Sequence, residues 1–211
     1  MDKIIIFGGT FDPIHNGHIA LANKLVEVFK TPVTFMPNNV PSYKAQPATT
    51  KQQRLAMLKL ALLNNPQFII DERELKEDNY TYSHRILTQL RNEIGNATPL
   101  YFVIGGDSLI SLDTWDYWDL LLNLTNFIVV NRSGYNIINL KPGKLNNLFQ
   151  QCKTDNFNDL TIPHGKFYVL DFTPPDISST IIRKKVNSGE DINHMLPIAV
   201  ANYIQKYQLY S

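Results

Sequence analysis

The segment Gly8-Gly9-Thr10-Phe11-Asp12-Pro13-Ile14-His15-Asn16-Gly17-His18 constrains the fold of this 211-residue chain more than any other part of it. It directly follows an apolar run, residues 3–7, that is typical of a buried strand, and it precedes residues 19–26, which are typical of a helix. A glycine turn between a first strand and a first helix is where α/β folds place phosphate groups, because free N–H groups and the helix dipole favour an anion there. The segment therefore predicts an α/β fold with an anion site at this turn.

Two histidines, His15 and His18, lie three residues apart at the expected helix start, so both occupy one face of its first turn. Imidazoles in that position can donate hydrogen bonds to phosphate oxygens and can take up a proton. Gly8 and Gly9 permit a tight turn with close backbone approach, and Thr10 adds a hydroxyl. The pattern lacks both the Gly-Lys-Ser/Thr ending of a P-loop and the G-x-G-x-x-G spacing of a dinucleotide fingerprint. The alternative interpretation is that the histidines and the glycine turn are structural only.

A second candidate anion site is the segment Pro-Pro-Asp-Ile-Ser-Ser-Thr-Ile-Ile-Arg at residues 174–183. Ser178 or Ser179 is expected to cap a helix here, and Arg183 lies one turn into that helix on the face shared with Thr180. Hydroxyls, free N–H groups and a guanidinium suit a polyphosphate. Taken alone, the segment is equally an ordinary helix cap. Its functional meaning depends on its pairing with the first motif.

Strands and helices alternate along the chain. Expected strands occupy residues 3–7, 32–36, 68–71, 100–104, 127–130 and 167–171, and expected helices occupy 17–30, 50–64, 82–94, 115–123, 179–186 and 197–207, with a further short helix at 145–152. This alternation predicts a doubly wound, mostly parallel Rossmann-like sheet with helices on both faces. In the second helix, the expected core-facing stripe is Leu55, Leu58, Ala61 and Leu62. The sequence shows no internal repeat and no long linker, so a single domain over residues 1–211 is expected.

The composition excludes several classes of protein. A net charge of +1 gives no overall attraction to nucleic acid or to a membrane surface, so neither is expected as a partner, and an anionic ligand must be bound by a local cluster of donors. The single cysteine, Cys152, excludes an intrachain disulfide and a cysteine-based zinc site, which fits a reducing compartment. The sequence has no signal-peptide pattern, so a cytoplasmic protein is expected. The oligomeric state stays open, with a homo-oligomer as one possibility.

Together, the two motifs resemble the nucleotidylyltransferase superfamily, whose signatures are H-x-G-H and I-S-S-T-x-I-R; residues 177–183 match the second signature at every fixed position. The resemblance extends over nearly the whole chain. It narrows to the bacterial nicotinate-nucleotide adenylyltransferases through residues 8–18, 37–41, 102–109, 114–115 and 131–134. It implies a reaction in NAD biosynthesis in which ATP and nicotinate mononucleotide give deamido-NAD and pyrophosphate. Mg²⁺ is expected to arrive with the ATP phosphates, because the sequence shows no dedicated carboxylate cage.

The same resemblance assigns roles to individual residues. The expected catalytic residues, His15, His18 and Arg183, would neutralise charge while the mononucleotide phosphate attacks the ATP α-phosphate in line, with no covalent enzyme intermediate. The residues expected to bind ATP are Gly8, Gly9, Thr10, Phe11, His18, Gly105, Asp107, Ile177, Ser178, Ser179, Thr180 and Arg183. Those expected to bind the mononucleotide are Asn39, Lys44, Tyr82, Ser83, Trp115 and Arg132. Alternatively, Asp107 is the N-cap of a following helical turn, Lys44 is a solvated surface lysine, and Tyr82 and Trp115 are core residues.

The chain departs from the family pattern at Tyr43, Asp116 and Ser133, where relatives often have a histidine, an aromatic residue and a proline. Asp116 is expected to face solvent, because an inward carboxylate would repel the carboxylate of nicotinate. Two other functions stay open: a related transferase acting on nicotinamide mononucleotide or phosphopantetheine, and a catalytically silent nucleotide sensor on the same fold. The intact histidine pair and the intact segment 177–183 argue against the sensor.

Overall fold

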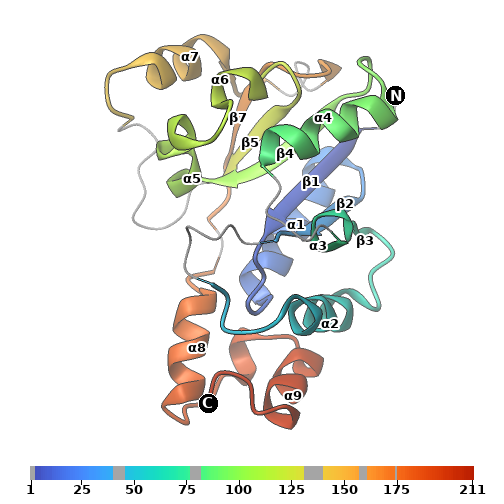
Figure 1. Cartoon of the computed structure of the whole chain (residues 1–211), viewed down its shortest axis with the longest axis vertical. Coiled ribbons are helices and arrows are strands. Elements are labelled where there is room, and N and C mark those ends of the chain that lie inside the picture. The colour runs from blue at the N-terminus through green and yellow to red at the C-terminus, as the bar shows by residue number, and fades with distance from the viewer. Residues whose placement is uncertain (1–2, 40–45, 77–81, 131–139, 157–160, 174) are drawn as a thin grey trace. The chain divides into compact units, whose positions relative to one another are not determined.

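The computed structural model describes residues 3–39, 46–76, 82–130, 140–156, 161–173 and 175–211 (Figure 1). The chain divides into two compact units. Unit 1 comprises residues 1–8 and 81–173, and unit 2 comprises residues 9–80 and 174–211. The single domain expected over residues 1–211 stays a prediction.

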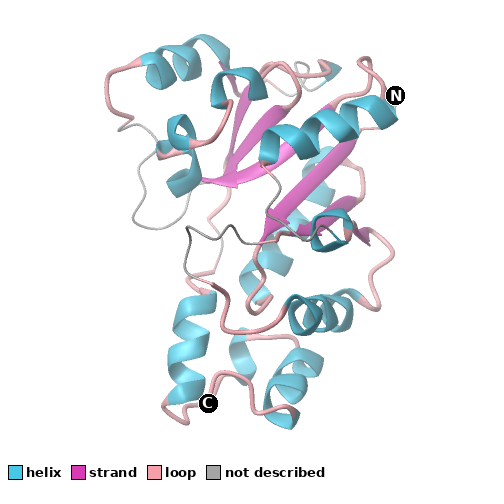
Figure 2. Ribbon diagram, viewed as in Figure 1, coloured by secondary structure: helices cyan, strands magenta, loops and turns pink. Residues whose placement is uncertain are grey.

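Unit 1 is built on a parallel sheet, drawn in magenta in Figure 2. Its strands are β1 (Ile4–Gly9), β4 (Leu100–Gly105), β5 (Asn126–Val130), β7 (Phe167–Leu170) and β6 (Lys153–Thr154), paired in that order. β5 is buried along its whole length, and β4 is buried except at its last residue, which is typical of parallel strands covered on both faces. The helices of this unit are α4 (Ser83–Ile94), α5 (Gly106–Ile110), α6 (Trp118–Leu121) and α7 (Lys144–Cys152), with a 3₁₀ turn η1 (Leu112–Thr114).

A buried arginine joins α4 to the loops around this sheet. The Arg91 guanidinium donates hydrogen bonds to four backbone carbonyl oxygens, those of Leu124, Thr98 and Pro163 at 2.6 Å each and that of Gly95 at 3.1 Å. Burial lowers the pKa of Arg91. Its role in unit 1 is structural.

Unit 2 contains the parallel strand pair β2 (Val33–Pro37) and β3 (Phe68–Ile70). Its helices are α1 (Asn16–Phe29), α2 (Lys51–Leu62), α3 (Arg73–Lys76), α8 (Ser179–Asn187) and α9 (Ile198–Lys206), with a 3₁₀ turn η4 (Asn193–Met195). α2 packs against α9, although the two helices are far apart in the sequence (Figure 1). No helix in the described parts of the chain is both long enough and apolar enough to cross a membrane.

The order of parallel strands and helices confirms the expected doubly wound, Rossmann-like α/β fold class. Every expected strand is present, with ends that differ from the expected ends by at most two residues, and the same holds for all but one of the expected helices. The helix expected over residues 115–123 is wrong: Trp115 is extended and Tyr117 has a φ of 55°, so the helix begins only at Trp118. The expected stripe on α2 is also partly wrong. Leu58 and Leu62 are buried, but Leu55 and Ala61 are only half-buried, and Arg54 and Met57 take their places.

Candidate active site

The H-x-G-H segment lies at the start of α1 in unit 2, as predicted. His15 is the N-cap, with an extended backbone, and its carbonyl oxygen accepts hydrogen bonds from the N–H groups of His18 and Ile19 at 2.9 and 3.2 Å. The His15 and His18 rings stack with their centroids 3.6 Å apart. The two imidazoles therefore share the end of the helix where the dipole favours an anion.

The hydrogen bonding of His18 identifies its donor atom. The backbone N–H of His15 donates to His18 Nδ1 at 3.2 Å. A ring nitrogen that accepts carries no proton, so neutral His18 is protonated at Nε2, which is the atom that can donate to a phosphate oxygen. The Phe11 ring meets His18 edge-on at 5.1 Å between centroids and helps to fix the plane of the imidazole. His18 is half-buried, whereas His15 is only 3 % exposed.

Gly17 makes room for this arrangement. A Cβ at this position would lie 3.0 Å from His15 Nδ1 and 3.6 Å from the carbonyl oxygen of Pro175. The first contact is tighter than most Cβ contacts in proteins, so a side chain here would push the His15 ring. The glycine between the histidines therefore has a steric role.

The second motif caps α8 in the same unit. Ser178 is the N-cap, and its Oγ accepts a hydrogen bond from the Ile181 N–H at 3.2 Å. Arg183 lies one turn further on, and its Nη2 donates to Thr180 Oγ1 at 3.3 Å. The structure thus decides between the two expected caps in favour of Ser178.

Two hydrogen bonds join the two motifs within unit 2. Ser179 Oγ donates to the carbonyl oxygen of Pro13 at 2.9 Å, across 166 positions of the sequence. Arg183 Nη1 donates to the carbonyl oxygen of Asp12 at 2.7 Å. The starts of α1 and α8 are therefore held together, and with them the imidazoles, the guanidinium and two sets of helix N–H groups. Such a set of donors can bind a polyphosphate and neutralise its charge.

Arg54, which is 2 % exposed, was not among the residues expected to form the site. Its Nη1 donates to the carbonyl oxygens of Thr10 and Asn38 at 2.7 and 3.0 Å, so it joins the segment after β1 to the segment after β2. Burial lowers the pKa of Arg54, and the nearby Asp12 and Glu74 oppose that shift. One signal of its burial was present in the sequence: Arg54 stands one turn before Met57 and Leu58, on the face of α2 that is buried.

Glu74 was not among those expected residues either. This side chain on α3 is 7 % exposed and accepts a hydrogen bond from the backbone N–H of Asn39, one of the residues expected to bind the mononucleotide. Burial, aided by Asp71, raises the pKa of Glu74 to about 8, against the lowering effects of the Asn39 hydrogen bond and of Arg54. Glu74 is therefore mostly protonated at neutral pH.

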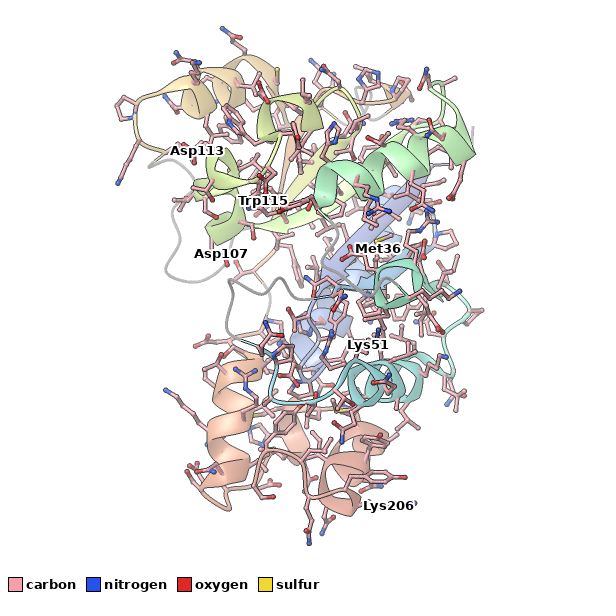
Figure 3. All side chains as sticks on the ribbon, in the orientation of Figure 1. Met36, Lys51, Asp107, Asp113, Trp115 and Lys206 are labelled. Carbon is pink, nitrogen blue, oxygen red and sulfur yellow. The ribbon has the colours of Figure 1, made fainter. Side chains whose placement is uncertain are left out.

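The other candidates for ATP binding, Gly8, Gly105 and Asp107, lie in unit 1. Gly105 is the N-cap of α5, so the alternative role of Asp107 as N-cap is wrong; Asp107 is an exposed residue of the first turn. Figure 3 labels Asp107 on α5 and Trp115 in the segment that follows. The binding roles of these residues stay predictions.

The starting residues of α4, Tyr82 and Ser83, also lie in unit 1. Tyr82 is the N-cap and is 42 % exposed, which rules out the core interpretation for this residue. The His84 ring lies 5.1 Å from the Tyr117 ring, so the start of α4 and the segment around half-buried Trp115 are neighbours. Asp116 is exposed, as expected. Lys44 and Arg132 lie outside the described residues.

The donors around α1 and α8 suit an anion rather than a cation. Among the described residues, no group of three or more His, Cys, Asp and Glu side chains could hold a metal ion. Imidazole N–H and guanidinium groups instead match the oxygens of a phosphate that carries its own cation. The donors present therefore fit a phosphate ligand.

The chain is similar to known proteins over nearly its whole length. Residues 6–185 match the model of the cytidylyltransferase-like family. A protein of Citrobacter koseri named "Probable nicotinate-nucleotide adenylyltransferase" is 39 % identical over 207 residues, 97 % of each chain. A Yersinia pestis protein of the same name is 40 % identical over 207 residues, 97 % of this chain and 94 % of its own. The solved structure of Plasmodium falciparum nicotinic acid mononucleotide adenylyltransferase complexed with NaAD has a TM-score of 0.72 at 21 % identity, covering 100 % of this chain and 98 % of that one.

Proposed function

The chain belongs to the cytidylyltransferase-like family and, within it, to the nicotinate-nucleotide adenylyltransferases, and from that premise we propose that it joins ATP and nicotinate mononucleotide to give deamido-NAD and pyrophosphate. The observation that carries the proposal is the pair of hydrogen bonds from α8 to the turn directly before the H-x-G-H segment, Ser179 to Pro13 and Arg183 to Asp12. They bring together the donors that a polyphosphate needs from two motifs at opposite ends of the sequence.

The proposed reaction needs no nucleophile from the protein. The phosphate of the mononucleotide is itself an anionic nucleophile, and it attacks the ATP α-phosphate in line while pyrophosphate leaves. The protein's work is to position two anions and to neutralise the charge that develops on the transferred and leaving groups. His18 Nε2, His15 and Arg183 are the groups in unit 2 to which we assign this work.

The cation in this proposal is Mg²⁺ carried by the ATP phosphates, where it would offset part of their charge. On the acceptor side, we propose that Asn39, Tyr82, Ser83 and Trp115, with Lys44 and Arg132, bind the mononucleotide. The hydroxyl and N–H of Ser83, at the start of α4, would meet the nicotinate carboxylate, and the Trp115 ring would stack on the pyridine.

The test is pyrophosphate release from ATP with each of three acceptors at matched concentration: nicotinate mononucleotide, nicotinamide mononucleotide and phosphopantetheine. We expect nicotinate mononucleotide to give the highest kcat/KM, with deamido-NAD identified by mass. Preference for either other acceptor would overturn the assignment of the acceptor. ATP binding with no turnover on any acceptor would instead favour a nucleotide sensor.

A matched pair of variants connects the activity to the proposed site. Arg183→Ala removes the guanidinium that contacts Asp12, while Lys184→Ala removes an exposed cation at the next position of the same helix. We expect Arg183→Ala to lower kcat/KM by at least about a hundredfold, as loss of a charge-stabilising donor does, and Lys184→Ala to leave it within about twofold. Equal effects would mean that α8 acts only through its general charge.

A further inference from the structure

Asp12, three residues before the H-x-G-H segment, has a role that the proposed chemistry does not use. The residue is 3 % exposed, and its carboxylate accepts three hydrogen bonds. Oδ2 accepts from the Ala48 N–H at 2.8 Å, and Oδ1 accepts from Thr49 Oγ1 at 2.5 Å and from Tyr210 Oη at 2.7 Å. We call these residues, Asp12, Ala48, Thr49 and Tyr210, the Asp12 cluster.

The Asp12 cluster contacts Arg183 at two points. Arg183 Nη1 donates to the carbonyl oxygen of Asp12 at 2.7 Å and lies 3.9 Å from the carboxylate oxygen Oδ2. The Arg183 side chain is about one third exposed, so it is not buried with the carboxylate. The position of the guanidinium therefore depends on where Asp12 is held.

Tyr210 is the donor to Asp12 that comes from furthest away, 198 positions along the sequence. Its pKa is raised, first by burial and then by Asp12, so the phenol keeps its proton and is a hydrogen-bond donor at neutral pH. A buried hydrogen bond to a charged acceptor is worth more than one between neutral groups. The Tyr210 hydroxyl thus adds a strong constraint on the Asp12 side chain.

We propose that Tyr210 is a positioning residue for nucleotidyl transfer: its hydroxyl orients Asp12, and Asp12 in turn holds the Arg183 guanidinium in place for the polyphosphate. The proposal rests on the proposed function, because it concerns the same reaction. Tyr210 itself contacts neither substrate in this scheme. Its effect should therefore pass entirely through Arg183.

The experiment is a double-mutant cycle with Tyr210→Phe and Arg183→Ala. Tyr210→Phe removes one hydroxyl and keeps the ring. The matched control is Tyr207→Phe, which removes the hydroxyl of a 51 % exposed tyrosine three residues earlier. Turnover is followed by pyrophosphate release, and the affinity for MgATP is measured by calorimetry on all four members of the cycle.

We expect Tyr210→Phe to lower kcat about five- to tenfold in the wild-type background and to have almost no further effect in the Arg183→Ala background. The same non-additive pattern is expected in the affinity for MgATP. Tyr207→Phe should stay within about twofold of wild type. Thr49→Val, which removes the other hydroxyl on Asp12 Oδ1, should reproduce the pattern if Tyr210→Phe does not fold.

Three results would overturn the proposal: no loss of kcat or of affinity in Tyr210→Phe, an equal loss in Tyr207→Phe, or a loss of the same factor in both backgrounds. The last result would mean that Tyr210 stabilises the fold without acting through Arg183. The calorimetric arm needs no acceptor, so it tests this proposal even if nicotinate mononucleotide is not the acceptor. Failure of the proposed function and failure of this inference are therefore separate outcomes.

Discussion

Replacing Glu74 with glutamine should change how the stability of the protein depends on pH. The folded protein holds the Glu74 proton up to a pKa of about 8, because the side chain is buried, whereas the unfolded chain loses it near the ordinary value of 4.5. Between these two values the folded state binds the proton and the unfolded state does not. The free energy of unfolding therefore falls as pH rises through this range.

The size of the effect follows from the two pKa values. Each pH unit between the two pKa values lowers the contribution of Glu74 to the free energy of unfolding by about 1.4 kcal/mol. Between pH 5 and pH 7 the contribution should fall by about 2.5 kcal/mol, slightly less than twice that figure, because the unfolded chain is still partly protonated at pH 5. Above pH 8 both states are ionised and the contribution levels off. Glutamine keeps an oxygen that can accept from the Asn39 N–H but cannot ionise, so the variant lacks this slope.

The assay is urea unfolding of wild type and Glu74→Gln at several pH values from 5 to 8. The quantity of interest is the difference between the two free energies of unfolding, because it cancels the titration of all other groups. Glu72→Gln is the matched control, since Glu72 is a partly exposed carboxylate two residues away that pairs with Lys59 at 2.7 Å. Two results would refute the reasoning. One is a difference in free energy of unfolding between wild type and Glu74→Gln that does not change with pH. The other is an equal change with pH in the difference between wild type and Glu72→Gln.

Three further substitutions test other parts of the structure. Arg91→Met should lower the free energy of unfolding by about 3 kcal/mol, because it removes the donor of four hydrogen bonds to partly buried backbone carbonyl oxygens. Urea unfolding measures this, and Arg85→Met on the exposed side of the same helix should stay within about 0.5 kcal/mol. Gly17→Ala should displace the His15 ring and lower kcat about tenfold with an unchanged circular dichroism spectrum; an unchanged kcat would contradict the steric role of this glycine. His18→Ala should lower turnover by about two or more decades while the fold survives, and an unfolded variant would instead make His18 a structural residue.

The features that sequence analysis predicted are those with local signals. α1 and α8 were expected because glycine, histidine and serine stand directly before apolar periodic runs, and both helices begin within one residue of the expected position. The helix expected from Trp115 was wrong because nothing in the residue type indicates that Tyr117 adopts a left-handed backbone. The local patterns thus described the elements well and their irregular junctions poorly.

Local patterns could not identify the hydrogen-bond partners of Arg54, Glu74 and Tyr210, because each side chain acts on a backbone or carboxyl group supplied by a distant segment. Tyr210 follows an ordinary amphipathic helix, and its partner lies 198 residues away. A buried arginine or glutamate is identified only when its neighbours are known, since both residue types are usually exposed. Sequence motifs identified the groups proposed to face the substrate, whereas the groups that hold them required the structure.

The charges around the H-x-G-H segment favour the anion site that we propose in unit 2, although the chain overall is not basic. Arg54 has two acidic neighbours, Asp12 and Glu74, but Glu74 is mostly protonated at neutral pH, so the positive charge of Arg54 is only partly offset. Asp12 is also shared with Arg183. One carboxylate thus compensates the charge of two guanidinium groups, and this leaves local positive charge beside the starts of α1 and α8. In the proposed function a polyphosphate supplies the missing negative charge, so a net charge of only +1 is compatible with ATP binding at a local cluster.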